Sequence, residues 1–232
     1  MTLLRIVAAG DAALVAEFDN RIDAGVNAHA VALAEHVRVQ GVRGVRDVVP
    51  TFRSVAVYFD PLVTDVDALA AMLRQATPMP MRDHASATAV IDVPVCYDSN
   101  YGPDLEDVAR RAGLDPDSVV SIHAGCEYRA FMLGFVPGFA YLGVMDARIA
   151  VPRRDTPRLE VPAGSVAIAG QQTGVYPSKT PGGWNIIGRT PLRTWTPDAE
   201  RPALFRAGDT VRFRRIDREA FDRMATGQAG GT

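Results

Sequence analysis

The apolar positions of the first 85 residues predict a small α/β unit. Apolar side chains at every second position of 54–59 are typical of a strand with one buried face. Apolar residues three or four positions apart predict a helix over 22–39, with a buried face made of Ile22, Val26, Ala30, Leu33 and Val37. The predicted order is β-β-α-β-β-α, with strands at 3–9, 12–18, 45–50 and 54–59 and helices at 22–39 and 66–75. Such a unit buries one face of a sheet under two helices.

Residues 77–87 contain two prolines and small polar residues, which predicts a linker. We therefore expect an N-terminal domain over 1–84 and a second domain over 88–226. The glycine-rich end, 227–232, is expected to be a flexible tail.

The predicted second domain changes its pattern along its length. It opens with a strand at 89–96 and helices at 105–112 and 115–123. Residues 125–190 then hold 10 of the 20 glycines and 6 of the 16 prolines, and helical periodicity disappears. Short β-branched pieces between Gly and Pro turns are typical of a compact β-barrel. The domain is expected to end with a strand at 210–216 and a helix at 219–224, which makes the chain α+β.

Composition excludes several classes of protein. Of the 232 residues, 47% are hydrophobic and 22% are charged, which is ordinary for a globular chain. The formal net charge is −2 and no basic stripe is present, so we expect no nucleic-acid partner. No apolar run approaches the roughly 20 residues of a membrane span, and no signal-peptide core is present. We therefore expect a soluble, cytoplasmic protein. Cys96 and Cys126 are too few for a disulfide framework.

The densest group of candidate functional residues lies between His123 and Thr190. Glycines there let backbone N–H groups approach a ligand, prolines stiffen the loops, and aromatic residues supply an apolar wall. A small-molecule pocket also needs a few convergent polar groups. The polar candidates are His123, Arg158, Ser165, Gln171, Gln172, Tyr176, Lys179 and Arg189. The same composition is typical of corners in a β fold, and residue types alone do not separate the two interpretations.

Two of these residues have competing interpretations. His123 could act as a general base, because the unperturbed pKa of histidine lies near physiological pH, or it could be a hydrogen-bonded residue at a helix end. Lys179 is the one lysine among 25 basic residues. It could bind a carboxylate or phosphate, or it could lie on an exposed loop.

Several short motifs lack part of the pattern they approach. GVYPSKT at 174–180 lacks the second glycine of a phosphate-binding loop, and no helix is predicted after it. His29 and His36 have no cysteine or acidic partner nearby, so we expect no metal site. Asp98 and Asp104 are expected to be turn and helix-capping residues and not a catalytic pair.

Longer strings resemble one known family. In the N-terminal half they are GDAAL (10–14), VPTFRSVAVYFDP (49–61) and VPVCYDSNYGPDLEDVA (93–109). In the C-terminal half they are MLGFVPGFAYLG (132–143), PR at 152–153 and 157–158, VPAGSVAIAGQQTGVYP (161–177) and PGGWNIIGRTPL (181–192). With His123 they extend over nearly the whole chain. The chain resembles the family of 5-oxoprolinase B subunits, also called allophanate hydrolase subunit 1 and KipI, with a carboxyltransferase C/D-type domain.

The resemblance implies a small N-terminal α/β sandwich domain and a C-terminal cyclophilin-like β-barrel. It implies two partners, a homologous C subunit and a separate A subunit. It also implies a reaction in which 5-oxo-L-proline is opened to L-glutamate with ATP hydrolysis. Related alternatives are a subunit of the allophanate hydrolase or urea carboxylase type and an inhibitor of a histidine kinase.

Opening a lactam needs donors for developing oxyanions and a base within reach of water. From residue type and loop position we assign catalytic roles to His123 as base and to Arg158, Lys179 and Arg189 as donors. The expected substrate-binding residues are Phe135, Pro137, Gly138, Tyr141, Ser165, Gln171, Gln172, Tyr176, Gly182, Gly183 and Trp184. Because no ATP-binding motif is visible, ATP is expected on a partner subunit or shared with one.

Overall fold

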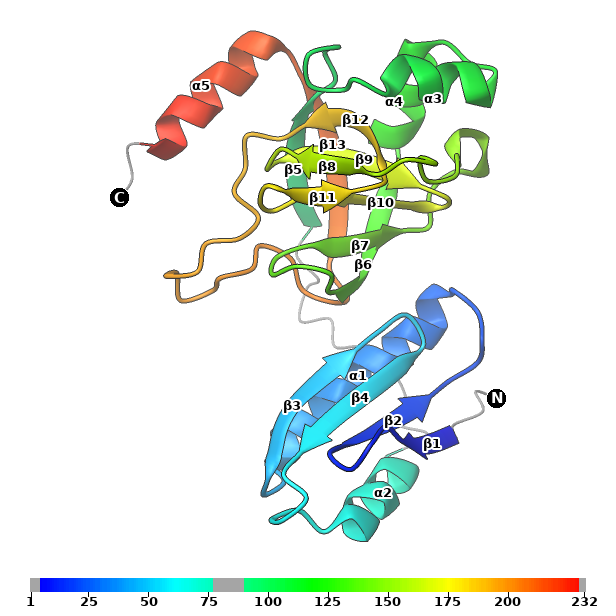
Figure 1. Ribbon diagram of the computed structural model, residues 1–232, viewed down its shortest axis with the longest axis vertical. Helices are drawn as coiled ribbons and strands as arrows, with labels where there is room; N and C mark the ends of the chain where they lie inside the picture. The colour runs from blue at the N-terminus through cyan, green and yellow to red at the C-terminus, as the bar shows by residue number, and fades with distance from the viewer. Residues whose placement is uncertain (1–4, 77–89, 230–232) are drawn as a thin grey trace. The chain divides into compact units, whose positions relative to one another are not determined.

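The computed structural model describes residues 5–76 and 90–229 (Figure 1). The chain divides into two compact units, Met1–Thr88 and Ala89–Thr232. Each unit has its own hydrophobic core. The predicted linker at 77–87 lies outside the described residues.

The first unit is a four-stranded antiparallel sheet with two helices. Its elements are β1 (Arg5–Ala8), β2 (Ala13–Glu17), α1 (Ala24–Gln40), β3 (Val45–Pro50), β4 (Ser54–Phe59) and α2 (Val66–Gln75). The strand order across the sheet is β1-β2-β4-β3, and both helices contribute side chains to one core cluster. The predicted β-β-α-β-β-α order is therefore confirmed.

Helix α1 begins and ends at its capping residues. The Asp23 side chain accepts a hydrogen bond from the Val26 backbone N–H at 2.9 Å, and Gly41 ends the helix in the left-handed conformation at φ 56°. The buried apolar residues of this helix are Val26, Ala30, Leu33, Ala34 and Val37. Ile22, which the sequence pattern placed on the same face, precedes the cap and is 57% exposed, so that assignment is wrong.

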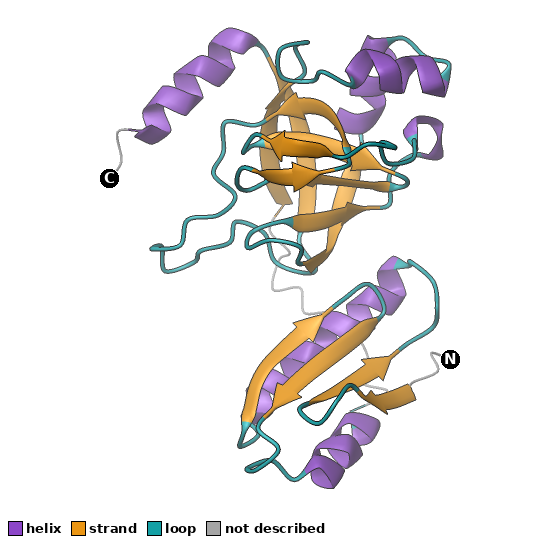
Figure 2. Cartoon of the chain, in the orientation of Figure 1, coloured by secondary structure: helices purple, strands orange, loops and turns teal. Residues whose placement is uncertain are grey.

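The second unit is a closed barrel of seven strands, with its helices outside the barrel wall (Figure 2). Its strand order is β10-β7-β6-β13-β5-β12-β9, and β11 pairs with β8 in a separate two-stranded sheet. The strands are β5 (Val90–Cys96), β6 (Glu127–Leu133), β7 (Ala140–Gly143), β8 (Arg158–Val161), β9 (Ser165–Ala169), β10 (Gln172–Val175), β11 (Thr180–Gly182), β12 (Asn185–Arg189) and β13 (Thr210–Ile216). The expected α+β fold with a barrel is confirmed.

The helices of this unit are α3 (Leu105–Ala112), α4 (Pro116–Ala124) and α5 (Arg218–Ala229), with a short 3-10 turn at Ala147–Ile149. Helix α5 is longer than predicted. It continues through 227–229, so the predicted tail begins too early, and residues 230–232 lie outside the described residues.

Strand β9 shows how the barrel wall separates two environments. Val166 and Ile168 belong to the main barrel core, whereas Ala167 and Ala169 belong to a second buried cluster on the opposite face of the strand. All five residues of β9 are buried, because both faces of this strand are covered. On neighbouring β10, a side chain at Gly174 would begin 3.0 Å from the Phe139 ring. Small outward-facing residues therefore make room for aromatic side chains on the outside of the barrel.

Two expectations from composition can be compared with the described residues. Cys96 and Cys126 are both free thiols, as their number predicted. Over 5–76 and 90–229, every helix is too short or too polar to cross a membrane.

Candidate functional site

His123 points from the last turn of α4 into the barrel core. Its side chain is fully buried and stacks on the Phe213 ring, with 4.5 Å between the ring centroids. Its Nδ1 lies 2.8 Å from the Tyr97 hydroxyl, and its Nε2 lies 2.9 Å from the Thr173 hydroxyl. Both ring nitrogens therefore have protein partners, and the ring does not reach solvent.

The hydrogen bonds around His123 fit one neutral tautomer. The Thr173 hydroxyl donates its proton to the Ala167 carbonyl at 3.1 Å, so its oxygen accepts from His123 Nε2–H. Nδ1 then accepts from the Tyr97 hydroxyl. Burial lowers the pKa of His123 to about 3, which keeps the ring neutral at physiological pH. This is the position of a hydrogen-bonded core residue near a helix end, the second of the two interpretations given above.

Arg158 is bound to a buried carboxylate. Its Nη1 and Nη2 donate to Asp104 at 2.8 and 2.7 Å, and Arg154 Nη1 donates to the same carboxylate at 2.8 Å. The Ile186 backbone N–H adds a fourth hydrogen bond at 2.7 Å. These partners satisfy the buried charge of Asp104. Because Arg158 belongs to β8 and Ile186 to β12, the carboxylate joins the start of α3 to both strands. The side chain of Asp104 has this connecting role instead of the helix cap expected from sequence.

Lys179 and Arg189 also have partners. Lys179 Nζ lies 2.6 Å from Glu160, and both side chains are more than half exposed. Arg189 Nε donates to the Ala163 carbonyl at 2.9 Å. GVYPSKT is followed by strand β11 and not by a helix, so the structure agrees that 174–180 is no phosphate-binding loop.

Five predicted or neighbouring aromatic residues gather on the outside of β7, β10 and β12. We call this group the aromatic wall: Phe135, Phe139, Tyr141, Tyr176 and Trp184. Phe139 is its centre, with ring centroids 4.9 Å from Tyr141, 5.3 Å from Tyr176 and 5.5 Å from Trp184. Edge-to-face pairs of this kind are the favoured aromatic geometry. Burial raises the pKa of both Tyr141 and Tyr176, so both hydroxyls keep their protons at neutral pH.

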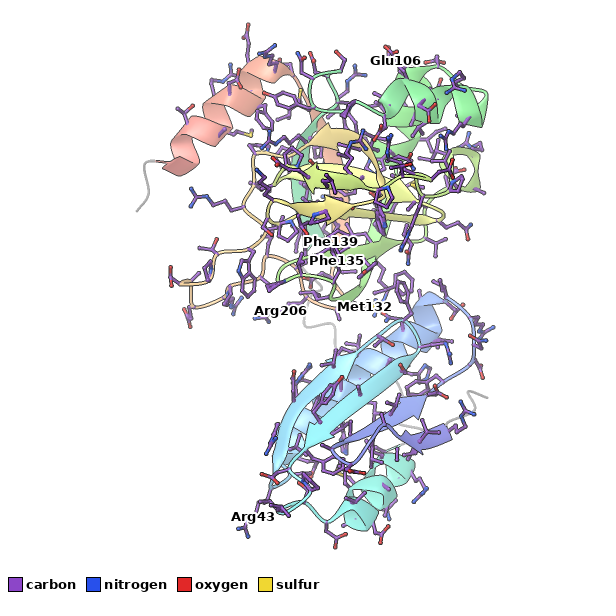
Figure 3. All side chains as sticks on the ribbon, in the orientation of Figure 1. Arg43, Glu106, Met132, Phe135, Phe139 and Arg206 are labelled. Carbon is purple, nitrogen blue, oxygen red and sulfur yellow. The ribbon has the colours of Figure 1, made fainter. Side chains whose placement is uncertain are left out.

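Phe135 gives the aromatic wall an exposed edge. It lies in the loop between β6 and β7 and is 59% exposed, next to the buried Phe139 (Figure 3). Its φ of 72° is the left-handed conformation, which costs a non-glycine residue roughly 1–3 kcal/mol and is concentrated at functional sites. A shallow groove of about 410 Å³ runs along this loop, lined by 133–138 with Trp195 and Ala203. The predicted Pro137 and Gly138 both belong to this lining.

The remaining predicted residues lie around the wall with different roles. Gly182 contacts the Tyr176 hydroxyl so closely that any side chain there would overlap it. The Gly183 carbonyl accepts a hydrogen bond from the Arg154 backbone N–H at 2.8 Å. Ser165 is buried, and its carbonyl accepts from the Tyr176 N–H. Gln172 pairs with Ala169 across β10 and β9, and Gln171 is exposed in the turn before it.

Sequence reasoning missed Arg153. Its guanidinium lies over the Trp184 ring, 5.9 Å from the centroid. The PR pair at 152–153 was visible as a motif, but three arginines lie close together at 153, 154 and 158. Only the positions of their acidic partners distinguish them. Within the described ranges, no group of three His, Cys, Asp or Glu residues is placed to hold a metal ion.

Comparison with known proteins shows the family of this chain. A family model for the carboxyltransferase domain, subdomain C and D, matches residues 4–205. The chain therefore belongs to the carboxyltransferase-domain family, subdomains C and D.

Within this family, the similarity to individual proteins is more specific. The chain is 39% identical over 222 residues to the B subunit of 5-oxoprolinase from Bacillus subtilis (strain 168), covering 91% of this chain and 92% of the relative. It is 52% identical over 123 residues to the B subunit of 5-oxoprolinase from Escherichia coli O157:H7, covering 53% of this chain and 56% of the relative. Among solved structures, TTHA0988 superposes with a TM-score of 0.80 at 34% identity; the match covers 93% of this chain and 41% of that chain.

Proposed function

We propose that this chain is the B subunit of an ATP-dependent 5-oxoprolinase. With A and C subunits it would open 5-oxo-L-proline to L-glutamate. The observation that carries the proposal is the similarity to the Bacillus subtilis protein, which extends over nine-tenths of both chains. A match of that extent includes both units of this chain, and not the barrel alone.

We assign the lactam-binding surface to the aromatic wall. A five-membered lactam is a small flat ring, and the exposed Phe135 ring and the half-buried Tyr141 ring offer it apolar surface, backed by the buried rings behind them. Because Tyr141 is only partly buried and stays protonated, its hydroxyl can donate a hydrogen bond to an oxygen of the substrate. Aromatic faces beside donors of this kind would hold and orient the amide while it is activated.

We assign ATP to a partner subunit or to the interface with one. Nucleotide phosphates need a cradle of backbone N–H groups and a free cation. In this chain the residues nearest to that pattern, 174–180, continue into a strand, and Lys179 pairs with Glu160. The chemical step that consumes ATP is therefore not assigned to residues of this chain.

The test is ATP-dependent glutamate release from 5-oxoproline by this chain assembled with the A and C subunits. We expect activity that disappears when this chain or ATP is left out. Phe135→Ala is expected to reduce turnover several-fold, since it removes the exposed edge of the wall. Leu159→Ala, at an equally apolar position that is 93% exposed on β8, is the matched control and is expected to have no effect. Activity that persists without this chain would overturn the proposal.

A second candidate is a carboxyl transfer to a urea-type amide, which the family's name favours. It would be supported if the assembled, folded complex fails to open 5-oxoproline but carboxylates urea when a carboxybiotin carrier is supplied. The same preparation tests both reactions, so the outcome chooses between them.

A further inference from the structure

The backbone around Arg153 is fixed against the aromatic wall. The Asn185 side-chain amide donates to the Pro152 carbonyl at 2.8 Å, and the Arg154 N–H donates to the Gly183 carbonyl at 2.8 Å. These bonds attach both neighbours of Arg153 to the segment that carries Trp184. The Arg153 side chain therefore starts from a held position, which lowers the entropy lost when it binds a ligand.

Arg153 is the cation at this surface that the fold leaves without an acidic partner. Arg154 and Arg158 bind Asp104, Lys179 binds Glu160, and Arg189 donates to a backbone carbonyl. Across residues 5–76 and 90–229, no hydrogen bond or ion pair is formed by the Arg153 guanidinium. Its contact is the Trp184 ring, and it is exposed on its other side.

The surroundings of Arg153 combine charge, hydrogen-bond donors and an apolar face. Burial raises the pKa values of Tyr141 and Tyr176, and the positive charge of Arg153 opposes both shifts, which shows that it acts on both phenols. A planar guanidinium binds a carboxylate through two parallel hydrogen bonds. Tyr141, the half-buried member of the wall whose phenol Arg153 acts on, offers apolar surface to a small ring beside that carboxylate.

We infer that Arg153 binds the carboxylate of a small cyclic amide whose ring lies against the aromatic wall. The inference rests on the proposed function, because 5-oxo-L-proline is a five-membered lactam with one carboxylate. It assigns the charge recognition to this chain and makes Arg153 the residue that selects the acid over an uncharged lactam. Arg153 is thus a specificity-determining residue, separate from the chemical step.

The kinetic test uses the assembled complex with Arg153→Gln. We expect KM for 5-oxoproline to rise about 30-fold while kcat stays within about threefold, because a lost charged hydrogen-bond pair weakens binding before the chemical step. Arg153→Lys keeps the charge but not the paired donors, so its KM is expected to lie between those of the parent and Arg153→Gln. Arg223→Gln on the exposed helix α5 is the control and should leave both constants unchanged. A loss of kcat with KM unchanged would overturn the inference.

A binding test separates this inference from the proposed function. The full chain, with Trp195→Phe so that Trp184 is the single tryptophan, is titrated with 5-oxoproline, 2-pyrrolidinone and inorganic phosphate, and Trp184 fluorescence is recorded. We expect 5-oxoproline to bind more tightly than 2-pyrrolidinone and phosphate, and Arg153→Gln to remove its advantage over 2-pyrrolidinone.

Tightest binding of phosphate, or an equal loss for the acid and the uncharged lactam in Arg153→Gln, would overturn the inference. If the complex has no 5-oxoprolinase activity but the chain still distinguishes the acid, the inference stands and the proposed function fails. If the complex is active and the chain makes no such distinction, the inference fails alone.

Discussion

Strand β10 separates two polar centres of very different character. On its inner side, Thr173 receives His123, whose ring is buried and whose two nitrogens are both hydrogen-bonded. On its outer side, Gly174 is covered by Phe139, beyond which Arg153 lies over Trp184 with no acidic partner among the described residues. One centre is complete within the protein, and the other has unused hydrogen-bonding capacity.

This contrast separates polar residues that stabilise the fold from those that are suited to bind a ligand. A polar group with all of its partners inside the fold contributes to stability and to a unique core. A charged group held rigidly beside an apolar surface, with donors to spare, is suited to bind something else. Substitutions at the inner centre should therefore act on stability, and those at the outer centre on ligands.

The largest effect on stability is expected from His123→Ala. It removes a stacked ring, leaves the Tyr97 hydroxyl without its partner and takes one of the two hydrogen bonds of the Thr173 hydroxyl, so the free energy of unfolding should fall by about 4 kcal/mol. Urea unfolding followed by tryptophan fluorescence measures this, because Trp184 and Trp195 both lie in the second unit. His36→Ala on α1 is the control and should leave that transition unchanged. If the variant is as stable as the parent but inactive in the complex, His123 is catalytic after all.

Acid is expected to destabilise the barrel through the same ring. Burial lowers the pKa of His123 from its ordinary 6.5 to about 3. Between these values the unfolded chain binds a proton that the folded chain does not, so this group lowers the free energy of unfolding by about 1.4 kcal/mol for each pH unit of acidification. Above about pH 6.5 its contribution is constant. Between about pH 7.5 and pH 5, the free energy of unfolding should fall more steeply with decreasing pH in the parent than in His123→Gln. Equal slopes would show that the ring titrates freely.

A smaller loss of stability is expected from Gly182→Ala, which lies at the outer centre. The new methyl group would overlap the Tyr176 hydroxyl, and overpacking of this kind costs roughly 1–3 kcal/mol. Because Tyr176 belongs to the aromatic wall, lactam binding should weaken as well. Gly227→Ala makes the same chemical change on α5, where nothing lies within 4 Å, and should be neutral or slightly stabilising. Unchanged binding in Gly182→Ala would remove Tyr176 from the proposed site.

The smallest effect is expected from Lys179→Gln. Its ion pair with Glu160 is exposed on both sides, and such pairs contribute less than about 1 kcal/mol. We expect stability within about 0.5 kcal/mol of the parent and turnover within about twofold. The assay is glutamate release by the assembled complex. A drop of tenfold or more would restore Lys179 to the catalytic role that its rarity suggested.

Local patterns in the sequence predicted most of the fold. The strand at 54–59 and the helix from 24 to 40 follow directly from apolar spacing and from caps such as Asp23. The strands at 165–169 and 210–216 were also predicted, because β-branched residues lie between turn signals. The short strands β8 and β11 were not separately predictable, since they have three or four residues and no repeating pattern.

The site was harder to predict because its geometry depends on distant partners. His123 is 26 residues from Tyr97 and 50 from Thr173, and only the closed barrel brings them together. Arg158 had the right chemistry for a donor, but Asp104, 54 residues away, binds it. The aromatic wall was easier, since its members follow one another along a segment rich in Gly and Pro. The sequence therefore named most members of the aromatic wall as candidates, but it did not show which charged side chains the fold pairs internally.

The parallel pairing of β5 with β13 has a consequence for synthesis. Val90 pairs with Thr210 and Cys96 with Ile216, so the first strand of the barrel lies beside the last. Until β13 has been made, the long edge of β5 that pairs with it has no neighbour, and unpaired edges of this kind attract other chains. Parallel contacts between distant segments also form slowly. A chain interrupted before residue 210 would thus have an open sheet with an unpaired edge, prone to association with other chains, in place of a closed barrel.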